Sequence, residues 1–328
     1  MTPFAYHRAQ SVADAVRAGM APGAHFLGGG TNLVDLAKGG VVRPMLLVDV
    51  SRLPLAEITT TADGGVRIGA MARNSDVANH PLIRARHPLL SQALLAGASP
   101  QLRNMATVGG NLLQRTRCPY FYDTAFEHCN KRVPGSGCDA VDGINRNHAI
   151  LGASAACIAT HPSDMCVALA ALRASVRVHG PRGERAIAMA DFHRLPGDAP
   201  QRDTTLAPGE LIVCVDLPAS GFADHAHYLK LRDRASYAFA LVSVAAALDM
   251  RDGVIQDAAL ALGGVAHKPW RRPAAEARLV GRTPSDAAFE EAADVLLDGA
   301  RPASQNGFKV TLARRAIVRA LRDAGAPA

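Results

Sequence analysis

The chain has 328 residues, 48% of them apolar and 20% charged, which is typical of globular proteins with about two domains. Its formal net charge is +7, but no basic run is interleaved with aromatic residues, so nucleic-acid binding is not expected. The most apolar run, Tyr237–Leu248, is shorter than the ~20 residues that a helix needs to cross a bilayer. We therefore expect no insertion into a membrane.

The first 55 residues predict a small α/β unit. Ser11 is a candidate N-cap for a helix that continues to Arg17, since serine accepts hydrogen bonds from the first turn. A strand ends at Leu27, and a glycine turn leads into a short helix over 32–38. The apolar run over 44–53 predicts a buried strand parallel to the one before the glycine turn.

The second region, residues 56–220, predicts an α+β unit. It begins with a hairpin over 55–71, turning at Asp63-Gly64-Gly65. Helices are expected near 75–79 and 89–96 and from Asp164 to Leu172, and strands at 175–180 and 209–218.

The third region, residues 224–328, predicts a three-stranded antiparallel sheet followed by a helical bundle. The strands lie within 227–265, with Arg251-Asp252-Gly253 as a turn. Helices are expected at 274–280, 285–297 and 309–322. The fold class is therefore α+β.

Two glycine motifs have the form of ligand-binding turns. The first, GGGTN at 28–32, lies between a strand and a helix, where glycines let the backbone approach an anion and helix N–H groups point toward it. It is neither a dinucleotide fingerprint nor a Walker loop, because Leu33 replaces the third glycine and no Gly-Lys-Ser/Thr follows. The second, ATVGGN at 106–111, is similar. Two such turns could hold one extended ligand from opposite sides or could be unrelated, and spacing alone does not name the ligand.

Four of the six cysteines have the spacing C-x10-C-x8-C-x18-C, at Cys118, Cys129, Cys138 and Cys157. Four thiolates can bind zinc or an iron–sulfur cluster. Zinc sites usually use close pairs of cysteines, which are absent here, so the wide spacing favours a cubane cluster; a disulfide remains an alternative. Cys166 and Cys214 lie in apolar segments, and we expect both in the core.

The order of the motifs resembles one family. A strand-GGGTN-helix, ATVGGNLLQ and HPSDMCVALAAL occur as in the FAD-binding subunits of molybdenum hydroxylases, and YLKLRDRASYAFALVSVAAAL extends the resemblance through the last region. The resemblance implies a two-part FAD-binding domain followed by a third domain. The expected FAD-binding residues are Gly28, Gly29, Gly30, Thr31, Asn32, Thr107, Gly109, Gly110, Asn111, Ser163, Asp164 and Lys230.

Individual roles follow from the same resemblance. The first motif would wrap the FAD diphosphate, and the second would face it from the other side. Ser163 and Asp164 would lie near the nucleotide and Lys230 near the flavin ring, although Asp164 could instead be a helix N-cap. The segment from Cys118 to Asp164 is similar to that of aldehyde oxidoreductases with a [4Fe–4S] cluster, within a loop at 115–160. The resemblance therefore assigns Cys118, Cys129, Cys138 and Cys157 to that cluster.

The family resemblance also implies partners. Substrate oxidation would occur at a molybdenum cofactor in a large subunit, and electrons would pass through a [2Fe–2S] small subunit to FAD here and on to an external acceptor. No catalytic acid–base arrangement is evident in this sequence. The N-terminus has no signal-peptide pattern, so the chain either stays in the cytoplasm or is exported with a partner that carries a signal. The family resemblance favours periplasmic localisation by co-export. Alternatives are a subunit of another molybdenum hydroxylase, a self-sufficient flavin oxidase and a zinc-stabilised binding module.

Overall fold

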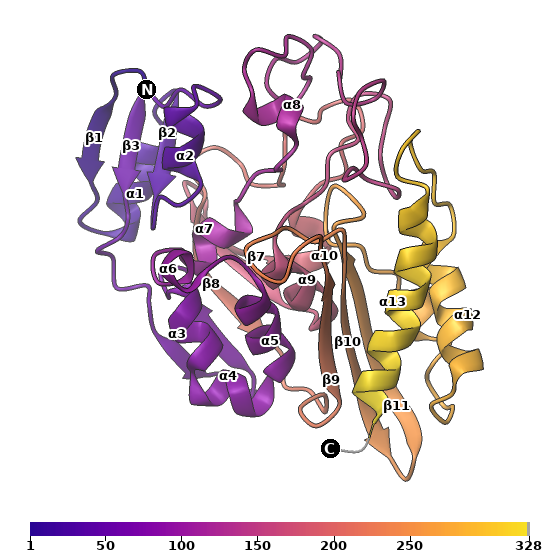
Figure 1. Cartoon of the computed structure of the whole chain (residues 1–328). Coiled ribbons are helices and arrows are strands. Elements are labelled where there is room, and N and C mark those ends of the chain that lie inside the picture. Colours follow the sequence, from indigo (N-terminus) through magenta and orange to yellow (C-terminus); the bar gives the residue numbers. More distant parts are fainter. Residues whose placement is uncertain (327–328) are drawn as a thin grey trace.

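The computed structural model describes residues 1–326 and contains three β-sheets (Figure 1). The first sheet is parallel, with the order β1-β3-β2, and comprises β1 (Ala5–Arg8), β2 (Ala24–Leu27) and β3 (Leu46–Asp49). Helices α1 (Val12–Gly19) and α2 (Leu33–Lys38) complete the unit. Ser11 Oγ accepts a hydrogen bond from Asp14 N at 3.1 Å, which confirms the predicted cap.

The second sheet is antiparallel, with the order β4-β5-β8-β6-β7. Its strands are β4 (Ile58–Thr60), β5 (Val66–Gly69), β6 (Ser175–Gly180), β7 (Gly183–Ala188) and β8 (Leu211–Leu217). Its helices are α3 (Asn74–Asn79), α4 (Pro81–Arg86), α5 (Pro88–Ala96), α6 (Pro100–Arg103), α7 (Val108–Leu112), α8 (Pro119–Tyr122), α9 (Asp164–Ala171) and α10 (Met189–Phe192). Every residue of α9 is buried, which explains why this helix lacks a polar face.

The third sheet is antiparallel, with the order β11-β10-β9, as predicted. It comprises β9 (Ala226–Leu231), β10 (Val242–Arg251) and β11 (Val254–Gly263), followed by α11 (Pro273–Glu276), α12 (Asp286–Leu297) and α13 (Phe308–Gly325). The turn between β10 and β11 places Asp252 at φ 51° and Gly253 at φ 75°, the left-handed pair that suits a two-residue hairpin. The helix expected at 274–280 is shorter than predicted, since it continues past Glu276 only as hydrogen-bonded turns.

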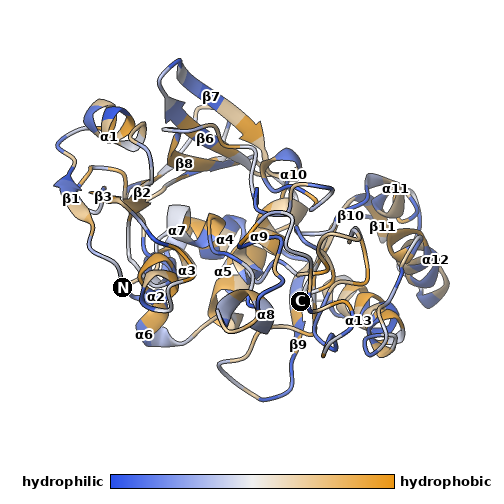
Figure 2. Ribbon diagram, turned by 90° about the horizontal axis from the view of Figure 1, so that it is seen from above, coloured by the Kyte–Doolittle hydropathy of each residue, from blue (hydrophilic) through white to orange (hydrophobic). Residues whose placement is uncertain are grey.

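Strand β10 is buried on both faces. Val244, Ala246 and Leu248 pack in the core that contains α12 and α13, whereas Ala245 and Ala247 pack in the core that contains α5 and α9. Side chains alternate across a strand, so β10 joins two cores at once. Figure 2 shows this sheet between α9 on one side and α12 and α13 on the other.

The segment over 115–160 is almost entirely irregular, with α8 as its one helix. In Figure 1 it lies beside the first sheet and extends toward α13. Buried polar side chains attach its far end to the C-terminal region: Asn306 Nδ2 donates to the carbonyls of His148 and Ala149 at 3.1 and 3.2 Å. No helix within residues 1–326 has the length and apolar character needed to cross a bilayer.

Candidate cofactor-binding site

The two glycine motifs lie against each other. A Cβ atom on Gly28 would stand 2.9 Å from Thr107 Oγ1, and one on Gly29 would stand 1.9 Å from the carbonyl oxygen of Met105. Gly30 has φ 74°, in the left-handed region that favours glycine. At Gly29 the first motif needs glycine because the backbone at Met105, directly before the second motif, approaches it, a reason that spacing in the sequence could not reveal.

Two cavities border these motifs. One of about 600 Å³ is lined by the first motif, by Thr107, Gly109 and Gly110, and by the start of β8. The other, of about 630 Å³, is lined by α5, by Asn111, Asp164 and Lys230, and by the loop before β10. Thr31, Asn32 and Gly110 line both. A single extended ligand can therefore occupy the two cavities across the shared residues, and each volume is in the range of ligand pockets.

Eleven of the twelve predicted FAD-binding residues line one or both of these cavities. The exception is Ser163, which lines an adjoining cavity of about 140 Å³ and reaches the site through another side chain. Its Oγ donates a hydrogen bond of 2.7 Å to Asn111 Oδ1. Ser163 therefore orients Asn111 rather than bordering either large cavity.

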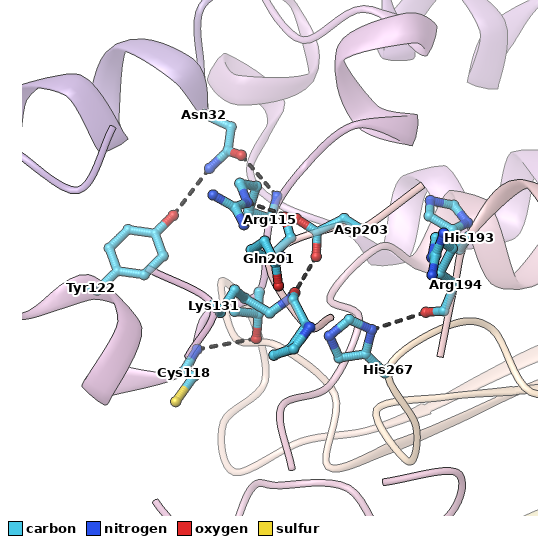
Figure 3. Close-up of polar contacts among 12 residues, drawn as sticks. Asn32, Arg115, Cys118, Tyr122, Lys131, His193, Arg194, Gln201, Asp203 and His267 are labelled. Atoms are coloured by element: carbon cyan, nitrogen blue, oxygen red, sulfur yellow. Dashed lines mark hydrogen bonds and ion pairs between the residues drawn. The ribbon is translucent and has the colours of Figure 1, made fainter. Parts of the chain in front are cut away.

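The side chain of Asn32 connects the first motif to the segment over 115–160, called here the cysteine-bearing segment. Its Nδ2 donates to the Tyr122 hydroxyl at 3.0 Å, and its Oδ1 accepts from Arg115 N at 2.9 Å (Figure 3). Both polar groups of the amide are thus engaged within the protein. Asn32 therefore holds the start of the cysteine-bearing segment, at Arg115 and Tyr122, against the first glycine motif.

Asp164 and Lys230 form a buried ion pair, with Oδ2 and Nζ 2.7 Å apart. Asp164 Oδ1 accepts from the Tyr228 hydroxyl at 2.7 Å, and burial together with this carboxylate raises the pKa of Tyr228 well above its usual value. The N-cap of α9 is Ser163, whose Oγ accepts from Cys166 N at 3.0 Å. The alternative that Asp164 is the N-cap is therefore wrong.

Sequence reasoning missed part of the cavity wall. The apolar run that begins at Tyr237 lies within the range predicted for the three strands, but β10 begins at Val242, and Tyr237 adopts φ 51° in the preceding loop. Tyr237 and Phe239 line the larger cavity, as does Arg117. The signal that could have found this loop is Arg232-Asp233-Arg234, a charged stretch between two apolar strands.

The four spaced cysteines converge on one small cavity. Cys129 and Cys138 are partners in an antiparallel bridge, and Cys118 is the N-cap residue of α8. All six cysteines are free thiols, so the disulfide alternative is not realised. Cys166 and Cys214 are buried in α9 and β8, as expected for core residues.

The cavity suppresses thiol ionisation. Burial raises the pKa of Cys118 to about 12 and that of Cys157 to about 11, and it also raises the pKa of Cys138. His148 Nε2 lies 3.1 Å from Cys118 Sγ, and burial lowers the pKa of this imidazole to about 4. Burial therefore disfavours the thiolate form of these three side chains.

A single zinc ion would require the four sulfurs to lie close together. Tetrahedral zinc–sulfur bonds place the sulfurs about 3.8 Å apart. Among residues 1–326, no three of the four cysteines bring their sulfurs within 4.8 Å of one another, since the one group that meets this limit is His161, Cys166 and His193.

That second group is not arranged as a metal site either. His161 Nδ1 accepts a hydrogen bond from Ser163 N at 3.3 Å, so Nδ1 is already engaged and the proton of the neutral ring is on Nε2. A protonated nitrogen cannot ligate a metal. The pKa of His161 lies well below its usual value because the ring is buried, so the ring stays neutral.

Comparison with known protein families identifies the family to which the chain belongs. Residues 2–220 match the FAD binding domain in molybdopterin dehydrogenase, and residues 227–324 match the CO dehydrogenase flavoprotein C-terminal domain. The chain belongs to the FAD-binding subunits of the molybdenum hydroxylases. This finding confirms the predicted family. It also identifies FAD as the ligand of the family of domains whose glycine motifs border the two cavities.

Individual proteins similar to this chain come from the same family. The chain is 52% identical over 330 residues to the aldehyde oxidoreductase FAD-binding subunit PaoB of Escherichia coli, covering 100% of each chain. It is 27% identical to the carbon monoxide dehydrogenase medium chain of Hydrogenophaga pseudoflava, covering 98% of this chain and 97% of that one. A solved structure of carbon monoxide dehydrogenase from that organism has a TM-score of 0.76 at 27% identity, covering 99% and 98% of the chains. These similarities confirm the predicted fold class.

Proposed function

We propose that this chain is the FAD- and [4Fe–4S]-binding electron-transfer subunit of a heterotrimeric molybdenum-dependent aldehyde oxidoreductase. The 52% identity over full length to an aldehyde oxidoreductase subunit carries the proposal. In it, a molybdenum-containing large subunit oxidises the substrate, and a [2Fe–2S] small subunit passes the electrons on. FAD, when bound here, supplies the redox chemistry that transfers them to an external acceptor.

The chain's own residues bind and orient the cofactor. The backbone of the two glycine motifs borders the cavity of about 600 Å³, which suits the diphosphate because N–H groups without side chains can approach it closely. The larger cavity is bordered by Lys230, whose charge is balanced by Asp164 at 2.7 Å. Because Asp164 and Lys230 are paired, they border the same part of FAD and not the nucleotide and the ring separately, as the family resemblance implied. We assign the ring portion to this cavity, where it would face an ion pair with no net charge.

Four cysteines fit the proposed cluster. Their sulfurs border one cavity and are spaced too widely for a single zinc ion. Lys131 lies close by, 3% exposed, and its positive charge opposes the rise that burial produces in the pKa of Cys157. A buried cation beside the sulfurs favours their thiolate form, which an iron–sulfur cluster requires.

Cofactor analysis of the purified complex tests both assignments. We expect about four irons and one FAD per copy of this chain, with a cluster absorbance beneath the flavin bands, and a molybdenum-containing subunit that co-purifies. Cys129→Ser should lose the iron, whereas Cys214→Ser, a matched change at a buried cysteine in β8, should keep it. Zinc in place of iron would contradict the cluster, and FAD without a molybdenum subunit would favour a self-sufficient oxidase.

Localisation belongs to the same proposal. Co-export of the folded trimer by a partner's signal would place the chain in the periplasm. Fractionation of cells that express all three subunits, with and without that signal, tests this expectation.

A further inference from the structure

Arg117 links the cysteine-bearing segment to the wall of the larger cavity. It directly precedes Cys118, and it lines the larger cavity and the adjoining small one. Its guanidinium carbon lies 5.2 Å from the centroid of the Tyr122 ring and 5.1 Å from that of Phe239. The guanidinium is therefore held between an aromatic ring of the cysteine-bearing segment and one from the loop before β10.

That loop, residues 232–240, is attached to the same segment at a second point. Arg146 donates to both carboxylate oxygens of Asp233, at 3.0 and 2.9 Å. On this loop, Tyr237 and Phe239 are 57% and 50% exposed and line the larger cavity. The cysteine-bearing segment thus holds both ends of a loop whose aromatic side chains border the cavity assigned to the flavin ring.

We propose that Arg117 is a positioning residue of the FAD site. By stacking between Tyr122 and Phe239 it holds the loop over the larger cavity, so that the cysteine-bearing segment helps to retain FAD. The inference rests on FAD occupying that cavity, as proposed above. It gives the segment a role at the flavin that does not require its cluster to carry electrons.

The planar shape of the Arg117 side chain is essential to this role. A guanidinium stacks on two aromatic faces at once, whereas the compact, strongly hydrated ammonium of lysine does not. The ion pair with Asp35, at 3.3 Å, joins a guanidinium to a carboxylate that is 55% exposed, and exposed pairs contribute little. Arg117 Nε is buried without a hydrogen-bond partner among the described residues, so stacking is the main contact that positions the group.

A double-mutant cycle on the assembled complex tests the contact. The variants are Arg117→Gln, Phe239→Ala and the double variant, with FAD removed and titrated back while its fluorescence is followed. We expect each single change to weaken FAD binding by about fivefold, and the double variant to be no weaker than either, because both remove one contact. Arg117→Lys should behave like Arg117→Gln, and iodide should quench the bound flavin more strongly in all of them.

Two further variants complete the design. Arg314→Gln removes an arginine that pairs with Asp294 and Glu290 far along the chain, and it should leave FAD affinity unchanged. Cys129→Ser should weaken FAD binding as Arg117→Gln does, and adding Arg117→Gln to it should weaken binding no further.

Several results would overturn the inference: additive effects of Arg117→Gln and Phe239→Ala, affinities equal to that of Arg314→Gln, or, where the wild-type complex contains iron, unchanged FAD affinity in Cys129→Ser. Loss of iron from Arg117→Gln while Phe239→Ala keeps its iron would also overturn it, because Arg117 would then act through folding of the segment. A wild-type complex without iron would refute the cluster alone, since the Arg117–Phe239 cycle does not depend on iron.

Discussion

Gly29 shows how a single missing side chain can determine a contact between two parts of the chain. Its Cβ position lies 1.9 Å from the carbonyl oxygen of Met105, a backbone atom that cannot rotate away. We expect Gly29→Ala to separate the two glycine motifs, to lower the free energy of unfolding by about 3 kcal/mol and to release FAD. Denaturant unfolding and flavin content of the purified complex measure both effects.

Gly307→Ala is the matched control for this change. Gly307 has an open Cβ position and φ −56° at the start of α13, so alanine adds a methyl group there without a clash. Wild-type stability and flavin content are expected. If Gly29→Ala behaved in the same way, the close approach of the two motifs would be refuted.

Because Lys230 and Asp164 form a buried ion pair, replacing Lys230 with methionine should lower stability strongly even though the side-chain volume changes little. Lys230→Met would leave the Asp164 carboxylate buried without its cation, although Tyr228 would still donate to it. Because an unpaired buried charge is unfavourable, we expect the free energy of unfolding to fall by about 3–5 kcal/mol. Arg319→Gln, which breaks an exposed i,i+4 pair with Asp323, should change it by less than about 1 kcal/mol. Similar values for the two variants would contradict this interpretation.

At the scale of elements, the cysteine-bearing segment is held by buried polar contacts in addition to small apolar clusters. Lys131 Nζ contacts Asp203 and donates to the carbonyl of Pro200 at 2.8 Å, while Arg115 Nε donates to Asp203 at 2.7 Å (Figure 3). Although burial alone would raise it, Lys131 and Arg115 hold the pKa of Asp203 far below its usual range. The carboxylate therefore binds the segment to the stretch that follows α10.

Asp203→Asn should loosen this segment. The amide leaves two cations without their counter-charge, and we expect a loss of about 3 kcal/mol in stability, accompanied by loss of iron. Replacing both partners, with Lys131→Met and Asp203→Leu together, should recover part of the stability because no buried charge is left unpaired. Thermal unfolding and iron analysis check this, and a double variant less stable than Asp203→Asn would refute the pairing.

Most elements could be predicted from the sequence because each shows either an apolar run typical of a buried strand or apolar residues at helical spacing. Strands β2, β3 and β8 are apolar runs, and α12 repeats its apolar residues at helical spacing between Ser285 and Gly299. Strand β7 was missed because it is an exposed edge strand, GERAIA, in which only Ile187 is buried. The loop before β10 was missed because its aromatic residues face a cavity, so that their apolar character does not reflect packing in a strand.

The sequence predicted which residues form the site but not which of them contact one another. The motifs and the four cysteines are local patterns, and the sequence displays them directly. The Asn32 contact with Tyr122 and the Lys230–Asp164 pair join residues 90 and 66 positions apart, and no local pattern encodes such contacts. The order of the motifs, rather than any one of them, was what pointed to the family.

At the scale of the whole molecule, two large cores share β10 and β11. Alanines on one face of these strands let α9 approach closely, and larger side chains on the other face pack against α12 and α13. The second and third regions thus share a continuous apolar interior. We therefore expect them to unfold together rather than as independent domains.

The buried histidines of this interior predict how stability depends on pH. Burial lowers the pKa of His87, His193 and His267 to about 4, whereas an imidazole in the unfolded chain titrates near 6.5. Between these values the unfolded chain binds protons that the folded protein does not. The free energy of unfolding should therefore be unaffected by these groups above pH 6.5 and should fall as the pH drops from 6.5 toward 4.

His87 isolates one such contribution, because both of its ring nitrogens lack hydrogen-bond partners among the described residues and the side chain can be replaced without breaking a bond. His87→Leu should reduce the slope of unfolding free energy against pH by up to about 1.4 kcal/mol per pH unit between 6.5 and 4. Urea unfolding at half-unit pH steps measures the slope, and equal slopes for His87→Leu and the wild type would show that folding does not lower the pKa of His87.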